Sequence, residues 1–353
     1  MQAKALEEAN RQLAICNACR YCEGFCASFQ AMTRYRSFDD QSIIHMANLC
    51  HNCQACYHSC QYTCPHEFDL NIPKALADVR VESWESHVPG TVIAEKVQSN
   101  GWIIALLTVI AAILFGLIGN IPWVSDANFY SLISHNSLVA VFTPLFIGPL
   151  LVLFMGLYRY WDTVGGEWIG WNDLSVAFKA AGTMKNLDGG MGQGCNYEKS
   201  DRYSQTRKWA HHATMYGFLL CFAATSVATI MHYGFGLEAP YPSLSLPKLL
   251  GVSGGILLTL GTTKLLYLKM KSDPKLGVSD RRSGEYGFIL ILWLVSTSGL
   301  LLYWLGGTAA AGAMLNIHLA SIAAFFVTLP YTKMAHGFFR LAALIREAQL
   351  SKA

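Results

Sequence analysis

Nine of the eleven cysteines lie in a stretch of forty-nine residues, from Cys16 to Cys64. Eight of them form two sets with the spacing C-x2-C-x2-C-x3-C: Cys16, Cys19, Cys22 and Cys26, then Cys50, Cys53, Cys56 and Cys60. The x2 spacing lets three thiolates from one tight loop reach three corners of a [4Fe-4S] cube. The chemistry that this pattern indicates is the transfer of single electrons.

The fourth cysteine of each set predicts how two clusters share their ligands, because in two-cluster ferredoxins it ligates the other cube. We therefore assign four cysteines to each cluster: Cys16, Cys19, Cys22 and Cys60 to cluster 1, and Cys50, Cys53, Cys56 and Cys26 to cluster 2. Cys64 leaves one choice open, since Cys64-Pro65 supplies the proline that usually follows a fourth ligand. Cys60 keeps the expected spacing, so we favour Cys60 and keep Cys64 as the alternative.

Three other interpretations of the cysteines are weaker. A disulfide framework needs an oxidising compartment, and the sequence before Cys16 shows neither the apolar stretch nor the cleavage site of an export signal. Two zinc sites would use C-x2-C pairs and leave the third cysteine of each triple without a metal. Buried structural cysteines would not keep a regular spacing.

The composition indicates a membrane protein, because charged residues make up 14% of the chain and about 25% of a typical soluble domain. Six apolar runs have about the length that crosses a ~30 Å hydrocarbon layer as a helix: 101–119, 138–158, 210–232, 249–268, 286–305 and 314–333. The net charge of +3 gives no argument for binding nucleic acid.

The distribution of Lys and Arg predicts the orientation of these spans. Loops 120–137 and 306–313 contain neither residue, whereas segments 159–209 and 269–285 are rich in both. Positively charged loops stay in the cytoplasm, so six spans place both termini there. We expect a multi-pass protein of the bacterial inner (cytoplasmic) membrane, in contact with lipid, whose cysteine domain faces the cytoplasm.

The expected fold class is mainly α. A helical, two-cluster ferredoxin-like domain should occupy residues 1–95, with helices at Leu6–Ile15 and from Pro73, a favourable first helical residue, to about Trp84. A six-helix transmembrane bundle should follow in 96–340, and a cytoplasmic tail in 341–353.

The inner loop 159–209 contains a glycine-rich run from Gly189 to Gly194. Glycines there could let a backbone approach a cofactor or a partner. We favour an ordinary loop that packs under the cysteine domain, because most loops of this kind have that role.

The membrane half holds six histidines, of which five lie on or at the ends of spans three and six: His211, His212, His232, His318 and His336. Imidazole is a common axial ligand of b-type haem, and such sites form between facing helices. Depth in the membrane pairs His336 with His212 or its neighbour His211 at the inner face, and His318 with His232 at the outer face. We predict a haem at the inner pair and, as a second site, one at the outer pair. Alternatively, these are interfacial histidines that contact head groups or water.

Three stretches resemble the tricarballylate utilization protein B family, also called CitB-domain proteins: CNACRYCEGFCASF, NLCHNCQACYHSCQYTCPHEFDLNIPKALADVR and NIHLASIAAFFVTLPYTKMAHGF. The resemblance covers essentially the whole chain. It implies two [4Fe-4S] clusters and b-type haem, which reoxidise the reduced flavin (FADH2) of an FAD-dependent tricarballylate dehydrogenase and pass electrons to the quinone pool. In the family pattern Cys60 is the fourth ligand, and the position of Cys64 is commonly proline.

Three alternatives compete with the function of an electron-transfer, quinone-reducing subunit for tricarballylate dehydrogenase. The partner could instead be a different flavoprotein, such as one in cobalamin synthesis. A membrane redox sensor would need an output domain, and none follows residue 340. A transporter would favour carboxylates within the spans, and the six apolar runs contain none. No G-x-G-x-x-G follows a strand pattern, so we expect neither a flavin nor a catalytic residue in this chain.

Overall fold

Five helices form the N-terminal part of the protein: α1 (Ala3–Cys19), α2 (Ala27–Met32), α3 (Asp40–Leu49), α4 (Ala55–His58) and α5 (Ile72–His87). The computed structural model describes residues 3–118, 133–190, 192–198, 202–239 and 241–352. The side chains of Asp39 and Asn71 accept hydrogen bonds from the first turns of α3 and α5, so polar caps start both helices. The helices expected at Leu6–Ile15 and Pro73–Trp84 are confirmed as parts of α1 and α5.

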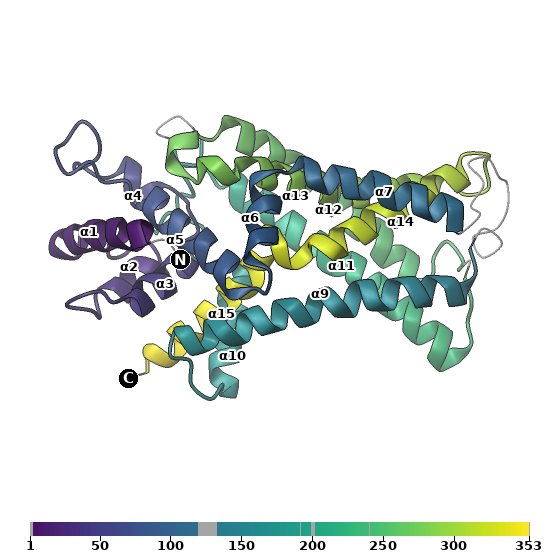
Figure 1. Ribbon diagram of the computed structural model, residues 1–353, viewed down its shortest axis with the longest axis horizontal. Coiled ribbons are helices and arrows are strands. Elements are labelled where there is room, and N and C mark those ends of the chain that lie inside the picture. The colour runs from purple at the N-terminus through teal and green to yellow at the C-terminus, as the bar shows by residue number, and fades with distance from the viewer. Residues whose placement is uncertain (1–2, 119–132, 191, 199–201, 240, 353) are drawn as a thin grey trace.

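Long apolar helices make up the other half of the molecule (Figure 1): α7 (Trp102–Ile118), α9 (His135–Thr163), α11 (Thr206–Phe235), α12 (Leu246–Lys271), α13 (Arg282–Leu305) and α14 (Ala311–Thr328). Among the described residues, five helices are long and apolar enough to cross a membrane. A sixth span requires α6 (Thr91–Ser99) and α7 to count as one, although the chain bends by 99° between them. Most of the expected outer loop 120–137 lies outside the described residues.

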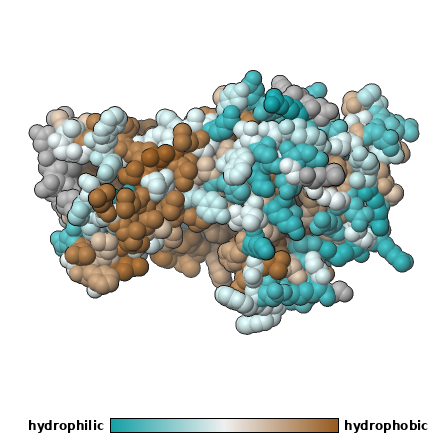
Figure 2. Space-filling model, turned by 180° about the vertical axis from the view of Figure 1, so that it is seen from behind, coloured by the Kyte–Doolittle hydropathy of each residue, from teal (hydrophilic) through white to brown (hydrophobic). Residues whose placement is uncertain are grey.

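The surface divides in the same way as the helices. Figure 2 shows apolar residues gathered over the long helices and hydrophilic residues over the end that carries the cysteine domain. Leu117 on α7 is 75% exposed and Phe154 on α9 is 67% exposed. Apolar surface of this extent is stable in contact with lipid rather than water, so the chain is a membrane protein.

Close approach of two backbones holds α11 against α12. A Cβ atom at Gly217 would lie 2.5 Å from the backbone nitrogen of Leu258, and one at Gly254 would lie 2.8 Å from that of Cys221. Small residues permit such packing between membrane helices. This contact fixes the position of α11, which carries His211 and His212 at its first turns.

Two segments that the sequence analysis treated as loop and tail contain helices. The inner loop 159–209 holds the end of α9 and all of α10 (Trp171–Thr183), and residues 191 and 199–201 of it lie outside the described residues. After α14 the chain makes a short 3₁₀ turn at Leu329–Tyr331 and continues as α15 (Ala335–Leu350). Helix α15 packs against α3, α9 and α10, so both chain ends lie at the cysteine-domain end of the molecule (Figure 1).

Candidate redox site

The four cysteines assigned to cluster 2 line one small cavity, together with apolar side chains such as Phe29 and Leu76. Cys50 and Cys53 are each 9% exposed, and all eleven cysteines, each among the described residues, are free of disulfides. Burial, followed by the charge of Cys50, raises the pKa of Cys26 to about 12. Burial likewise raises the pKa values of Cys53 and Cys56. Four thiols that converge on one cavity, where a free thiolate is costly, are a donor set that fits an iron–sulfur cluster.

The four cysteines assigned to cluster 1 also act on one another. Burial raises the pKa of Cys16 to about 12, with smaller effects from Cys22, Cys60 and Cys19. Burial raises the pKa of Cys22 to about 12 as well, and Cys60 and Cys19 add to this. Cys64 is exposed, and its charge raises the pKa of Tyr57, after the larger effect of burial. The cysteines assigned to cluster 1 are therefore near enough to influence one another.

Among the described residues, no three His, Cys, Asp or Glu side chains are arranged to hold a metal ion. The assignment of ligands to the two clusters, including Cys60 over Cys64, therefore stays a prediction.

The glycine-rich part of the inner loop covers the loop that carries Cys53. The backbone nitrogen of Asn196 donates to the Cys53 carbonyl at 3.0 Å, and Cys195 is buried in one apolar cluster with Cys53. Gly190 has φ +91°, and a Cβ atom there would lie 2.5 Å from Phe25 Cα. Only glycine permits this approach, so the loop packs closely on the cysteine domain. Sequence analysis missed Cys195, which stands outside both cysteine motifs.

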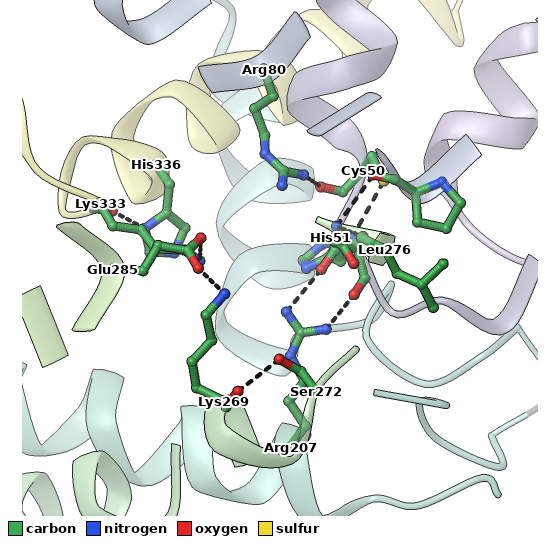
Figure 3. Close-up of polar contacts among 12 residues, drawn as sticks. Cys50, His51, Arg80, Arg207, Lys269, Ser272, Leu276, Glu285, Lys333 and His336 are labelled. Carbon is green, nitrogen blue, oxygen red and sulfur yellow. Dashed lines mark hydrogen bonds and ion pairs between the residues drawn. The ribbon is translucent and has the colours of Figure 1, made fainter. Parts of the chain in front are cut away.

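Three arginines from three helices converge on the backbone of residues 50–52, and Figure 3 shows two of them, Arg80 and Arg207. Arg80 of α5 and Arg340 of α15 each donate to the Cys50 carbonyl at 2.5 Å. Arg207 of α11 donates to the carbonyls of Asn52 at 2.6 Å and His51 at 3.1 Å. We call these three residues the arginine collar. Sequence reasoning did not find it, because no spacing rule connects three residues so far apart in the chain.

Burial sets the electrostatics of the collar. It lowers the pKa of Arg340 to about 9, and the charge of Arg80 adds to this, whereas the charge of Cys50 opposes it. Burial lowers the pKa of Arg80 too, while the charges of Cys50 and Glu285 raise it. The carboxylate of Glu285 contacts Lys269 and Lys333, as Figure 3 shows. Positive charge is therefore in excess next to the cavity of the cluster 2 cysteines.

His211 and His336 meet beside the collar. Their ring centroids are 5.9 Å apart and the rings are nearly perpendicular. His336 Nδ1 hydrogen-bonds the Lys333 carbonyl, an arrangement that orients a ligating histidine and leaves Nε2 for a metal. Burial, followed by the charges of Arg340 and His211, places the pKa of His336 well below its usual value, so its ring is the neutral form that binds iron.

The other three predicted histidines have different neighbours. His212 packs between Trp209 and Tyr216, with ring centroids 5.9 Å from each, and lines an open hollow with them. His232 stacks on His135 with centroids 4.1 Å apart. His318 Nδ1 lies 3.1 Å from the hydroxyl of Ser298. These contacts bring His211, rather than His212, to His336, and they give no support to a pair of His232 and His318.

The expected course of span six has to be corrected. It was expected to be one helix over residues 314–333, with His336 at its end. Helix α14 ends at Thr328, and Pro330 lies in the 3₁₀ turn that follows. Because proline disrupts a continuing helix, His318 and His336 belong to different helices.

Two family models match successive parts of the chain. The family model described as "Citrate utilization protein B Fer4-like domain" matches residues 9–86, which include both cysteine sets, and the model described as "Citrate utilization protein B" matches residues 98–353. The citrate utilization protein B of Escherichia coli is 42% identical over 349 residues, which are 97% of this chain and 91% of that protein. No solved structure matches the chain.

Proposed function

Because the chain belongs to the citrate utilization protein B family, we propose that it is a membrane electron-transfer subunit that delivers electrons from a reduced flavoprotein to quinone. The partner in this proposal is an FAD-dependent enzyme similar to tricarballylate dehydrogenase, and a flavoprotein of cobalamin synthesis is the alternative. An iron–sulfur electron-transfer role agrees with the Fer4-like match over residues 9–86.

The observation that carries the proposal is the position of the cluster 2 cysteines between the outer cysteine set and the histidines. Cys26, Cys50, Cys53 and Cys56 line one cavity. Arg207, which lies four residues before His211, donates to the backbone that follows Cys50. Arg340, which lies four residues after His336, donates to the carbonyl of Cys50 itself. The candidate sites therefore form one continuous region from the exposed Cys19 to the ends of the membrane helices.

The residues that would hold the cofactors follow from the contacts above. Each cysteine set would hold one [4Fe-4S] cluster through its first three cysteines, and its fourth cysteine, Cys26 or Cys60, would bind the cluster of the other set. His211 and His336 would hold b-type haem. When bound, these groups supply one-electron carriers. The chain's own residues enclose the thiols of the cluster 2 cysteines in one cavity and fix the ring of His336 through the Lys333 carbonyl.

The test of the proposed function measures reoxidation of a reduced FAD-dependent dehydrogenase by quinone. We expect reoxidation only with membranes that contain this chain. Cys53→Ser should abolish it and remove about half of the cluster iron, because serine is a poor ligand for iron–sulfur clusters, which are held by thiolates. Cys195→Ser is the matched control, since Cys195 is buried beside Cys53 but lies outside the motifs. Equal rates with and without the chain would contradict the proposal.

The haem ligands are tested separately by absorbance spectra of the purified, reduced protein. His336→Ala should remove the haem bands and retain the iron–sulfur signal, because the cysteines lie on other elements. His212→Ala should retain both, since His212 faces Trp209 and Tyr216 instead. Haem loss in His212→Ala with normal haem in His211→Ala would reverse the choice between the two neighbours.

A further inference from the structure

We propose that Arg80, Arg207 and Arg340 bind the anionic iron–sulfur cluster of Cys26, Cys50, Cys53 and Cys56 and raise its reduction potential above that of the other cluster. This inference rests on the proposed iron–sulfur sites. It assigns the arginine collar a role in setting the direction of electron flow, from cluster 1, which we call the outer cluster, to cluster 2, which we call the inner cluster.

The first support is the geometry of the collar. Its three guanidinium groups come from α5, α11 and α15 and make their hydrogen bonds to the carbonyls of residues 50–52, the loop that carries two of the cluster 2 ligands. Arg80 is 7% exposed, and its Nε has no hydrogen-bond partner among the described residues. Positive charge is thereby fixed next to this cavity by helices from both halves of the molecule.

The second support is the charge balance of this layer. The carboxylate whose charge reaches Arg80 is Glu285, and it already contacts Lys269 and Lys333. Among the described residues that these contacts join, the three arginines of the collar and two lysines share this one carboxylate. Buried charges are stable only when they are paired, so the collar calls for a further anion. A [4Fe-4S] cluster with four thiolate ligands is such an anion.

The third support is that the collar contacts one of the two cysteine loops and not the other. Arg80 and Arg340 both donate to the Cys50 carbonyl, and Cys50 lines one cavity with Cys26, Cys53 and Cys56. Among the described residues, none of the three arginines bonds the loop of Cys16, Cys19 and Cys22. The collar therefore places its positive charge beside one set of thiols only.

The consequence for the reaction follows from charge. When the inner cluster takes one electron from the outer cluster, the inner cluster gains one negative charge and the outer cluster loses one. Net charge, hydrogen bonding and exposure set the potentials of such clusters, and a fixed cation acts more strongly in a buried site than in water. The collar therefore stabilises the reduced inner cluster, and electrons from the partner's flavin collect on the side of the membrane half.

The test is a redox titration of the full-length protein in detergent, in which electron paramagnetic resonance follows each cluster. The Cys53→Ser variant identifies the signal of the inner cluster. Arg340→Gln and Arg80→Gln should each lower the equilibrium constant for electron transfer from the outer to the inner cluster about tenfold, a shift of ~59 mV for one electron. The outer cluster should keep its potential.

Two controls separate charge from packing. Arg340→Lys keeps the positive charge and should restore most of the wild-type potential. Arg11→Gln removes an exposed arginine that pairs with Glu8 and should shift neither potential. If Arg340→Gln and Arg80→Gln both keep wild-type potentials and normal cluster content, the proposed role of the collar is wrong, whereas the proposed function is unaffected. Absence of any iron–sulfur signal from the wild-type protein would overturn the proposed function and the collar together.

Discussion

The two cysteine sets, the outer one from Cys16 to Cys26 and the inner one from Cys50 to Cys60, share one spacing but differ in what surrounds them. Cys19 of the outer set is exposed, whereas Cys50 and Cys53 of the inner set are almost completely buried. The inner set is covered by the loop at Asn196 and contacted by arginines of α5, α11 and α15. The outer set also touches the inner loop, where Gly190 approaches Phe25, but among the described residues none of the three collar arginines bonds it.

This difference shows how one motif can serve two purposes. The ligand spacing determines which metal group a loop can hold, but the surroundings determine its potential and its accessibility to a partner. An exposed set suits exchange of electrons with a docked flavoprotein. A buried set that is bonded to membrane helices suits exchange within the chain.

The largest expected effect comes from removing one ligand from each set in turn. Cys50→Ser should remove the inner cluster and leave Arg80 and Arg340 without a negative partner. Loss of one partner from a buried charge pair costs about 3–5 kcal/mol, so we expect the free energy of unfolding to fall by that amount. Cys16→Ser should cost less, because no buried cation depends on its cluster.

The measurement is thermal unfolding of each variant in detergent, together with its haem spectrum. Cys50→Ser should also reduce haem content, because Arg340, which would lose the negative charge of the cluster, lies on α15 with His336. Equal losses of stability in Cys16→Ser and Cys50→Ser would remove the distinction between the two sets.

An intermediate effect should follow from a change in the loop that covers the inner set. Gly190→Ala places a Cβ atom 2.5 Å from the Phe25 backbone, whereas Gly192→Ala has a similar positive φ but nothing within 4 Å. Both substitutions strain the backbone, so their difference isolates the clash. Overpacking costs ~1–3 kcal/mol, and Gly190→Ala should unfold that much more easily than Gly192→Ala. The inner cluster should also lose iron to a chelator faster in Gly190→Ala, and identical rates in the two variants would contradict this role of the loop.

The smallest effect should come from the cap of α3, the helix that leads into the inner set. Asp39 accepts a hydrogen bond from Ser42 N at 2.9 Å, and Asp39→Ala should lower the free energy of unfolding by about 1 kcal/mol. Hydrogen bonds from Ser42 lower the pKa of Asp39. The carboxylate of Asp39 therefore stabilises the fold fully above its unfolded pKa of about 3.9. This stabilisation is lost as the pH falls through the lower pKa of the folded state.

The pH effect is measured by chemical unfolding of wild type and Asp39→Ala at several pH values. The two should converge in acid, and the potential of the inner cluster should be the same in both. A difference in stability that grows as the pH falls would show that Asp39 acts in another way.

Much of the fold was predictable, because hydrophobic length and cap residues act locally. The five single-helix spans and the helices around Leu6–Ile15 and Pro73–Trp84 follow from such patterns. The bend between α6 and α7 did not, since it depends on packing against other helices. Helix α15 was expected to be a tail, because its mixture of charged and apolar residues reveals little until a partner surface is known.

The candidate site was predictable in its ligands and not in its surroundings. The cysteine spacing predicts which thiols bind the clusters, and the ends of the spans indicate which histidines are candidate haem ligands. To choose His211 over His212, one has to know which face of α11 points to His336, and this is known only from the tertiary structure. The arginine collar required the tertiary fold, because Arg80, Arg207 and Arg340 stand in separate helices and share no periodic pattern with the cysteines.

The collar also fixes when the inner site can be completed during synthesis. Cys50 leaves the ribosome early, but the guanidinium group that bonds its carbonyl belongs to Arg340, near the end of the chain. Nearly every membrane helix has to be made and inserted before the two can meet. A chain interrupted before α15 would carry a finished outer site and an unfinished inner one. If the proposed function holds, a fully assembled inner site is thus a mark of a fully inserted protein, and incomplete chains would lack a route for electrons into the membrane.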